Sequence, residues 1–367
     1  MLHWKAFGLA IFAALCLLGE TTGSAHAQCN IFGCATEWSV GGITVLPGFP
    51  GASASAAYGV NDAGQVVGSS SVGGVVYATE WSDGHIINLG LPPGSTFGVA
   101  YNINDHGQAV GSSTVGIFTS ATEWSSDGSV INLGGLPGST YSQANSINDA
   151  GHAVGGSGGG GTQTATEWSS DGSVINLGGL PGFTNSEANS INDTDEVVGE
   201  SIVGGIQYAT EWSHGSVINL GGPRGSTDNY AMSINDAGQA AGISVVDGFQ
   251  SATEWSHGKV IDLGCLPGSS FCWATGINDA GQVVGYSQVD GVTYATEWRG
   301  SSIIDLGGLP GSTFSAALGI NDGGQVVGYS TFPVPESSAW AMMLVGFASL
   351  ALAGYRRAKA GHATLAR

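Results

Sequence analysis

Carboxylates are the most regularly spaced reactive groups in this sequence. One glutamate recurs in seven Ala-Thr-Glu-Trp tetrapeptides and one aspartate in seven Asn-Asp pairs, both at intervals of 43 or 44 residues. The glutamates are Glu37, Glu80, Glu123, Glu167, Glu211, Glu254 and Glu297, and the aspartates are Asp62, Asp105, Asp149, Asp193, Asp236, Asp279 and Asp322. Such a set could coordinate calcium, which takes roughly six to eight oxygens, or supply the paired acids that cleave a glycosidic bond.

A role in folding explains the same pattern better. An Asn-Asp pair before x-Gly caps a tight turn through its own side chains, and glutamate beside tryptophan in a strand can hold neighbouring backbone N–H groups. Repetition in every copy favours this role, because a functional site usually occurs once. We therefore predict no catalytic residue and no cofactor, and keep bound calcium as the alternative.

Tryptophan follows the repeated glutamate in every copy. Exposed aromatic rings stack on sugars, but seven equivalent tryptophans are better suited to filling the space between repeats. The series is Trp38, Trp81, Trp124, Trp168, Trp212, Trp255 and Trp298. Trp273 lies outside it and is the better candidate for a single surface role. Tyr286 and Tyr329 follow Val-Val-Gly in only two copies, so we expect them to face solvent as well.

Histidines do not supply a catalytic set. His85, His214 and His257 fall in the turn after the repeated tryptophan, whereas His106 and His152 fall near the Asn-Asp turn. Scattered turn positions in different repeats do not build one centre. The sequence also lacks a G-x-S-x-G elbow, a phosphate-binding loop and a zinc-protease motif. These features predict a protein that is not an enzyme.

Two departures from the repeat are candidate recognition edges. The fourth copy has Asp193-Thr194-Asp195-Glu196 instead of Asp-Ala-Gly-Gln, which places Asp195 where the backbone geometry of glycine is needed. Residues 155–161 are almost all glycine and are predicted to form a flexible loop.

The charge of the chain excludes one class of partner. There are 28 acidic residues against 8 Lys and Arg, and only Arg224, Lys259 and Arg299 lie between the two ends of the chain. A body this acidic repels phosphate backbones, so we expect no nucleic-acid binding.

The repeat that carries these residues predicts short strands. In one copy, strand-like runs at 282–287, 293–298, 303–306 and 315–320 are separated by turn sequences rich in Gly, Asn, Asp and Pro. Four strands in about 43 residues match the size of a propeller blade. We predict an all-β fold, a seven-bladed β-propeller of four-stranded blades over residues 28–331, with an open β-repeat solenoid as the alternative.

The two ends of the repeat region favour a closed ring. The region begins with an Ala-Thr-Glu-Trp strand at 35–38 and ends at 325–330 with the strand that precedes it in every other copy. These segments could therefore complete one shared blade. Whether the side chains at one mouth of the ring diverge or stay alike would then indicate where a ligand binds.

Residues 1–27 are predicted to be a signal peptide with a short signal helix. Lys5 precedes an apolar stretch at 6–18, and Ala25 and Ala27 fit the small-x-small pattern of a signal-peptidase site, with cleavage after Ala27. We therefore expect the protein to be exported through the inner membrane.

Residues 332–367 are predicted to be a sorting tail. Val334, Pro335 and Glu336 precede an apolar run whose residues 338–355 can form a transmembrane helix, and Arg356 and Arg357 follow. This order resembles the PEP-CTERM signal, although Ser337 stands where that family usually has a second proline. The resemblance implies an exosortase-type enzyme as partner and delivery to the surface, outer envelope or extracellular matrix of a Gram-negative-type bacterium.

Export makes the cysteines candidates for disulfides. Cys16 leaves with the signal peptide, and Cys29, Cys34, Cys265 and Cys272 remain. Three connectivities are possible, and the close spacings favour Cys29–Cys34 and Cys265–Cys272. Zinc is the alternative, but the spacing and the lack of nearby histidines disfavour it.

The repeat itself resembles the HAF extracellular repeat over about residues 35–330. The matching parts are residues 77–81, 87–90 and 103–111, although Ala-Thr-Glu-Trp replaces the His-Ala-Phe type strand. The resemblance implies an extracellular repeat protein and carries no known activity. We predict a non-enzymatic binding or structural role with extracellular polysaccharide or a surface protein as partner; the alternatives are a propeller enzyme acting on polysaccharide and a protein-binding adhesin.

Overall fold

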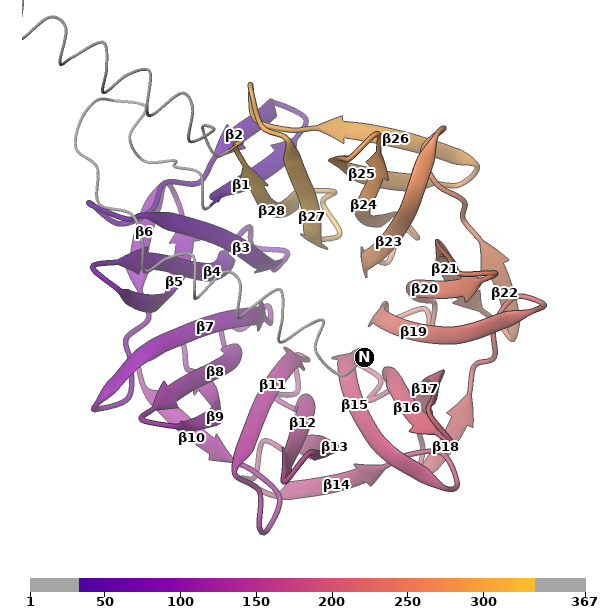
Figure 1. Cartoon of the computed structure of the whole chain (residues 1–367). Helices are drawn as coiled ribbons and strands as arrows, with labels where there is room; N and C mark the ends of the chain where they lie inside the picture. The colour runs from indigo at the N-terminus through magenta and orange to yellow at the C-terminus, as the bar shows by residue number, and fades with distance from the viewer. Residues whose placement is uncertain (1–32, 334–367) are drawn as a thin grey trace, which may run out of the picture. The chain divides into compact units, whose positions relative to one another are not determined.

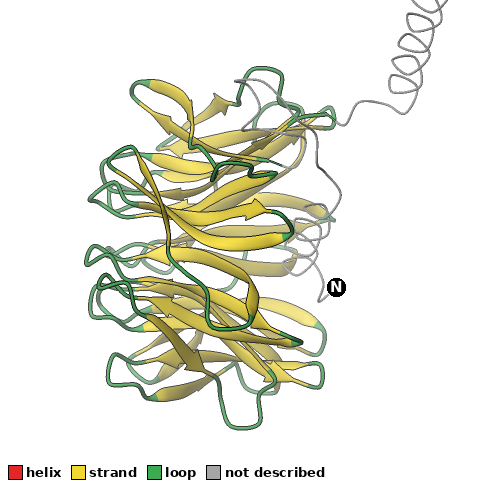
Figure 2. Cartoon of the chain, turned by 90° about the vertical axis from the view of Figure 1, so that its left-hand side faces the viewer, coloured by secondary structure: helices red, strands yellow, loops and turns green. Residues whose placement is uncertain are grey.

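The computed structural model of the protein describes residues 33–333. These residues form 28 β-strands and no helix, and those up to Phe332 belong to one compact unit. Figure 1 shows the strands in groups around a central axis, and Figure 2 shows them running between two faces where loops and turns lie. This arrangement is a β-propeller.

Each group contains four strands that pair antiparallel in order, and we call the groups units 1 to 7. Unit 1 contains β3 (Ala54–Val60), β4 (Val66–Val72), β5 (Val75–Ser82) and β6 (His85–Asn88). Unit 2 contains β7 (Ser95–Ile103), β8 (Ala109–Val115), β9 (Phe118–Trp124) and β10 (Val130–Gly134). Unit 3 contains β11 (Tyr141–Ile147), β12 (Ala153–Gly159), β13 (Thr162–Trp168) and β14 (Val174–Gly178). Unit 4 contains β15 (Phe183–Ile191), β16 (Val197–Val203), β17 (Ile206–Ser213) and β18 (Ser216–Asn219).

The remaining units follow the same order, except that the last one joins the two ends of the described chain. Unit 5 contains β19 (Ser226–Ile234), β20 (Ala240–Val246), β21 (Phe249–Ser256) and β22 (Lys259–Asp262). Unit 6 contains β23 (Ser269–Ile277), β24 (Val283–Val289), β25 (Val292–Arg299) and β26 (Ser302–Gly307). Unit 7 combines β27 (Phe314–Ile320) and β28 (Val326–Thr331) with β1 (Cys34–Ser39) and β2 (Gly42–Val45). In each unit the first strand in this order lies nearest the axis, and we call it the inner strand (Figure 1).

Pairing between β1 and β28 joins the first and last described strands. The register runs from Cys34 opposite Ser330 to Trp38 opposite Val326. The hydroxyl of Thr36 also donates to the hydroxyl of Ser330 at 3.2 Å, across 294 residues of sequence. The complementarity of the sequence ends predicts this pairing.

In each unit the second strand carries a glycine after two residues of Val or Ala, and this glycine lies where the inner strand has a bulge. Gly111, for example, pairs beside the shift between Ala100 and Asn102. A Cβ atom at Gly111 would lie 1.9 Å from the carbonyl oxygen of Val99, so only glycine allows this approach.

The glycine-rich segment 155–161 was predicted to be a flexible loop, and this prediction is wrong. Residues through Gly159 belong to β12, and only Gly160 and Gly161 form its turn. Gly156 leaves room for the side chain of Gln163, which a Cβ would meet at 2.2 Å. The glycines therefore serve close strand packing.

The hydrophobic core lies between neighbouring units. Seven clusters of buried side chains each combine residues of two neighbours, including one cluster that joins units 7 and 1 through Val327 and Trp81. All seven repeated tryptophans belong to these clusters and are between 1% and 4% exposed. Their predicted core role is thus confirmed.

Several sequence predictions fall outside the described residues. These are the signal peptide with its cleavage site, Cys29, and the sorting tail with its transmembrane helix. Within residues 33–333, no helix has the length and apolar character needed to cross a membrane.

Candidate functional site

Two cavities lie on the axis of the ring, and all seven units contribute to the lining of each. The first, of about 190 Å³, is lined by the seven Asn-Asp pairs and the apolar residue before each pair. The second, of about 270 Å³, is lined by earlier residues of the inner strands. We call the two ends the Asn-Asp mouth and the divergent mouth; six of the apolar residues border both cavities.

A ring of asparagines surrounds the axis at the Asn-Asp mouth. Each repeated asparagine is at most 7% exposed, and its Nδ2 donates to the backbone carbonyl of the next asparagine at 2.9–3.1 Å. The seventh bond, from Asn321 to Asn61, closes the circle. Each Oδ1 also accepts the N–H of the residue four positions later, which caps the turn as the sequence predicts.

The aspartates form a second ring beside the asparagines. The backbone N–H of each aspartate donates to Oδ1 of the aspartate in the next unit at 2.8 Å, and the bond from Asp322 to Asp62 completes the set. The carboxylates thus hold neighbouring units together. Within residues 33–333, no group of three or more His, Cys, Asp or Glu side chains is placed to hold a metal ion.

The repeated glutamates accept bonds from side chains, which corrects the expectation that they hold backbone N–H groups. In units 1, 2, 5 and 6 the glutamine after the Asn-Asp turn donates its Nε2 to this glutamate at 2.9–3.2 Å. The donor is an amide at the end of the Asn-Asp turn, and the pairing of the following strand with the strand of the glutamate brings it into reach.

The aspartate ring places like charges close together. Burial raises the pKa of Asp236 and of Asp322, and the other ring aspartates raise both further. When the pKa of a carboxyl group is higher in the folded than in the unfolded state, protonation of that group stabilises the fold. This stabilisation is complete below the unfolded-state pKa and is lost as the pH rises through the folded-state pKa. The charges of Asp236 and Asp322 therefore lower the stability of the fold at neutral pH.

Asp236→Asn is expected to raise the melting temperature at pH 7 in low salt. The amide oxygen can still accept the N–H of Asp193, while one charge of the ring disappears. The increase in melting temperature should be smaller in about 1 M NaCl, where the screening length falls to roughly 3 Å. It should vanish near pH 3, where the aspartates are protonated. Thermal melts at the two salt levels measure this, and a lower melting temperature under both conditions would contradict it.

Units 3 and 4 depart from the pattern together. His152 replaces the glutamine in unit 3, and its Nδ1 lies 2.9 Å from Oδ1 of Asp195 in unit 4. Asn148 donates to the same oxygen at 2.9 Å. Asp195 has a φ of 61°, the left-handed backbone expected from the glycine that it replaces. Asp195, which belongs to the predicted recognition edge, therefore pairs with a departure from the repeat in the neighbouring unit.

A like-charge pair also distinguishes unit 4. Glu196 stands in the place of the glutamine, and Asn192 donates to it at 2.9 Å. Burial raises the pKa of Glu211, and the nearby Glu196 raises it further. A hydrogen bond present in other units is thus replaced by repulsion.

Glu196→Gln is expected to stabilise the protein by about 1 kcal/mol at pH 7, the usual net value of one hydrogen bond. The variant restores the Gln–Glu arrangement of units 1, 2, 5 and 6. Because the pKa of Glu211 is raised, the benefit should be largest above that pKa and disappear below pH 4. Urea unfolding at pH 7 and pH 3.5 tests this; an equal effect at both would show that charge is not the cause.

The side chains of the inner strands differ between units at the divergent mouth. Three residues before the repeated asparagine, units 1 to 7 carry Tyr58, Tyr101, Asn145, Asn189, Met232, Thr275 and Leu318, all of which line the second cavity. Five residues before it, units 3 to 6 carry the partly exposed Gln143, Glu187, Tyr230 and Trp273, whereas the equivalent residues Ala56, Val99 and Ala316 of units 1, 2 and 7 are buried. The same strands thus end beside identical Asn-Asp pairs at one mouth and carry different residues at the other.

Five aromatic side chains meet on units 6 and 7, whose inner strands line the second cavity through Thr275 and Leu318, and we call them the aromatic wall. They are Phe271, Trp273, Tyr286, Phe314 and Tyr329. Ring centroids lie 5.6 Å apart for Trp273–Tyr286, 6.3 Å for Tyr286–Phe314 and 5.3 Å for Phe314–Tyr329. All five are partly exposed. The sequence singled out three of them separately and missed both phenylalanines.

Burial also affects the tyrosine hydroxyls of the wall. It raises the pKa of Tyr329 to about 12 and that of Tyr286 well above its usual value. Both hydroxyls therefore stay protonated at physiological pH and can donate hydrogen bonds.

Amide and carboxylate groups occupy the opposite part of the mouth, on units 3 and 4. The hydroxyl of Tyr141 donates to Gln143 at 2.8 Å, and Gln143 donates to Asn145 at 2.7 Å. Asn145 in turn donates to Glu187 at 3.0 Å. This network orients the polar side chains within the protein itself.

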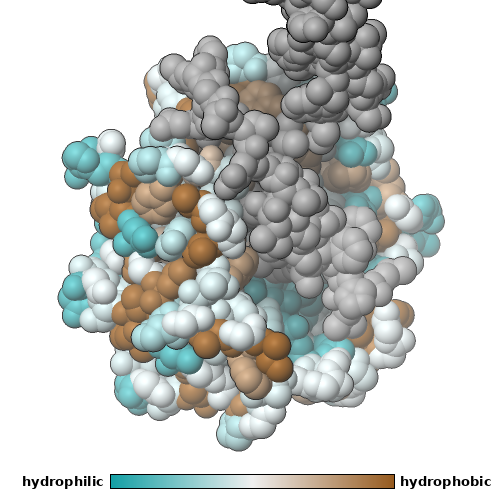
Figure 3. Space-filling view, turned by 60° about the vertical axis from the view of Figure 1, so that its left-hand side comes forward, coloured by the Kyte–Doolittle hydropathy of each residue, from teal (hydrophilic) through white to brown (hydrophobic). Residues whose placement is uncertain are grey.

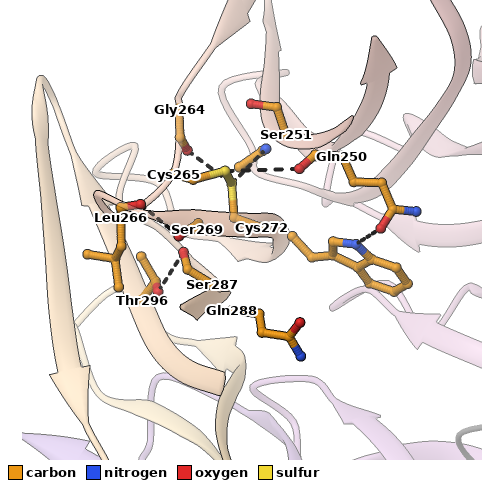
Figure 4. The surroundings of a disulfide bond; sticks show 12 residues. Gln250, Ser251, Gly264, Cys265, Leu266, Ser269, Cys272, Ser287, Gln288 and Thr296 are labelled. Atoms are coloured by element: carbon orange, nitrogen blue, oxygen red, sulfur yellow. Dashed lines mark hydrogen bonds between the residues drawn. A yellow bond between two sulfur atoms is a disulfide. The ribbon is translucent and has the colours of Figure 1, made fainter. Parts of the chain in front are cut away.

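A disulfide between Cys265 and Cys272 lies next to the aromatic wall, and Cys34 is disulfide-bonded as well. Cys272 replaces a serine whose hydroxyl accepts a neighbouring backbone N–H in other units, and its sulfur accepts the N–H of Ala252 at 3.3 Å. Figure 4 shows Cys265 on the loop beside Gly264 and Leu266, and Cys272 on the strand. The bond ties this loop to β23, which carries Phe271 and Trp273.

The periphery of the ring repeats from unit to unit. Outer strands expose one isoleucine in each of six units, by 36% to 43%: Ile87, Ile131, Ile175, Ile218, Ile261 and Ile304. Figure 3 shows brown patches alternating with white and teal on the described part of one side. The divergent mouth differs from this surface because its residues are not repeated.

Comparisons with known proteins support the fold. No family model and no curated protein matches the sequence. Among solved structures, virginiamycin B lyase from Staphylococcus aureus is 13% identical with a TM-score of 0.52, and the match covers 75% of this chain and 94% of the lyase. A prolyl endopeptidase is 9% identical with a TM-score of 0.50, over 70% of this chain and 43% of that one. TolB from Acinetobacter baumannii is 14% identical with a TM-score of 0.44, over 72% and 63% of the two chains.

Proposed function

We propose that this protein is an exported, non-enzymatic binding protein that takes its ligand at the divergent mouth. In this proposal each unit is one blade of a closed, seven-bladed propeller, and the complete rings of asparagine and aspartate bonds support the closure. The sorting tail places the protein at the cell surface or in the extracellular matrix after recognition by an exosortase-type enzyme.

The contrast between the two mouths is the observation that supports a binding role. Every unit contributes the same Asn-Asp pair to the Asn-Asp mouth, and these pairs form bonds between units, so folding accounts for them. The divergent mouth varies in shape and chemistry although the same strands form it. The lining of its cavity is mainly polar, and Asn102, Asn145 and Asn189 offer hydrogen-bond donors and acceptors to a ligand.

Binding to matrix material from cells of the source organism tests the proposal. The protein lacking residues 1–27 and 334–367 is incubated with the insoluble matrix, and bound protein is separated by sedimentation. We expect saturable binding without release of soluble product, and strong loss of binding in the double variant Tyr101→Ala/Gln143→Ala.

Asp105→Asn is the matched control, because it changes the Asn-Asp mouth and keeps the acceptor for Asp62. It should bind like the unchanged protein. Release of soluble product, or equal loss of binding in the control, would overturn the proposal.

A further inference from the structure

Resting on the proposed binding role, we propose that the ligand is an uncharged polysaccharide whose sugar units pack against the aromatic wall while their hydroxyls bond to the amides of units 3 and 4. The wall and the amide network border the same mouth, and together they match the two kinds of surface that a sugar presents: apolar C–H faces and hydroxyl groups.

The aromatic wall is not required by the fold. At the positions of Tyr286 and Tyr329, other units have Ser69, Ser112, Gly156, Glu200 and Ile243, and these units build the same four strands. The clusters that pack unit 6 against units 5 and 7 consist of other side chains, among them Cys272, Trp298 and Trp38. Five large rings gathered outside the core, at one mouth only, are therefore better explained by a ligand.

The wall is held in place before a ligand arrives. Nε1 of Trp273 donates to Oε1 of Gln250 at 2.9 Å, which orients the indole. The disulfide fixes the strand on which Trp273 lies. A surface ordered in advance loses little conformational entropy on binding, so its apolar area contributes more fully to affinity.

The polar part of the mouth suits hydroxyl groups. Gln143, Asn145 and Asn189 each carry both donors and acceptors, as a sugar hydroxyl does. Their orientation is set by mutual bonds and by bonds to the protein, such as that from Asn189 to the carbonyl of Ala231 at 2.8 Å. Such groups discriminate among hydroxyl arrangements, because a mismatch leaves a polar group unpaired.

The acidic residues at the divergent mouth favour an uncharged polysaccharide over an anionic one. The residues that form the mouth include Glu187 and Glu200 but no lysine or arginine. Uronic acid or sulfate groups would be repelled here, as the acidic body repels polyanions generally.

Affinity electrophoresis tests the inference on the protein lacking residues 1–27 and 334–367. Gels contain a mixed-linkage β-glucan, dextran, galactomannan or alginate. We expect retardation in at least one of the three neutral polysaccharides and none in alginate. Trp273→Ala should weaken binding about tenfold or more, as loss of a central aromatic anchor does, whereas Trp273→Phe should retain most of it.

Phe118→Ala is the control, because Phe118 is 56% exposed at the start of β9 in unit 2, which contributes no residue to the aromatic wall. It should leave retardation unchanged, and equal melting temperatures exclude unfolding as the cause of any loss. Absence of retardation in all three neutral gels, stronger retardation in alginate, or unchanged binding by Trp273→Ala would overturn the inference. If the protein still bound the matrix material in any of these cases, the proposed binding role would stand and only the neutral polysaccharide would be wrong as the ligand. If it bound neither the matrix material nor the polysaccharides, both proposals would be refuted.

Discussion

Removal of β1 and β2 is expected to destroy the cooperative fold of the protein. A chain that starts at residue 46 loses the partner of β28 and the buried Trp38, which is 4% exposed. Loss of the Trp38 side chain alone should lower the free energy of unfolding by about 3–5 kcal/mol, and the broken strand pairing should lower it further. In a closed ring this damage also exposes the interface between units 7 and 1, so unfolding should spread to all units.

Circular dichroism and calorimetry measure this expectation, with a chain that starts at residue 33 as control. The control keeps every described strand and should melt in one sharp transition. Addition of a peptide of residues 33–45 to the truncated chain should restore part of the stability. An open solenoid would lose only its terminal unit, so a truncated chain with a nearly unchanged melting temperature would contradict ring closure.

Trp124→Ala is expected to destabilise the protein by about 3–5 kcal/mol, the usual cost of removing a fully buried aromatic ring. Trp124 is 1% exposed, packs between units 1 and 2, and donates its Nε1 to the carbonyl of Gly90 at 3.0 Å. The variant leaves both a cavity and an unpaired carbonyl. Urea unfolding followed by circular dichroism gives the free energy difference.

The same strand supplies a matched control. Phe118 begins β9 and Trp124 ends it, but Phe118 is 56% exposed. Phe118→Ala should change the free energy of unfolding by less than about 0.5 kcal/mol. A small effect of Trp124→Ala, together with loss of ligand binding, would show that the repeated tryptophans serve recognition instead of packing.

The sequence predicted most of the repeated features because each depends on local chemistry. Short β-rich runs between Gly and Asn-Asp turns predicted the order of strands within a unit, and the complementary ends predicted the pairing of β1 with β28. Seven equivalent tryptophans predicted the core between units. Glycine composition misled at residues 155–161, because the same residue serves flexible loops and tightly packed strands.

Features that depend on contacts between units could not be predicted. The bond from the N–H of one aspartate to the next carboxylate requires the spacing of neighbouring turns. Trp273, Tyr286 and Tyr329 attracted attention one at a time, but strand register and the neighbouring unit bring them together with Phe314. Pairing of His152 with Asp195 likewise joins two departures from the repeat that lie 43 residues apart.

The two mouths together describe how a repeat protein can acquire a specific site. Bonds between identical residues hold the ring at the Asn-Asp mouth, so the residues at the other mouth are free to differ without loss of the fold. Under the proposed binding role, sequence differences there change the ligand surface, whereas we expect differences at the Asn-Asp mouth to change stability, as for Asp236→Asn.

Hydroxyl-radical footprinting with and without matrix material tests the binding role of the divergent mouth most directly. Trp273 and Tyr141 report on this mouth, and His106, whose side chain is 66% exposed, reports on the Asn-Asp mouth. We predict that the ligand protects Trp273 and Tyr141 from oxidation and leaves His106 unchanged. Protection of His106 with continued oxidation of Trp273 and Tyr141 would place the ligand at the wrong mouth and contradict the proposed function.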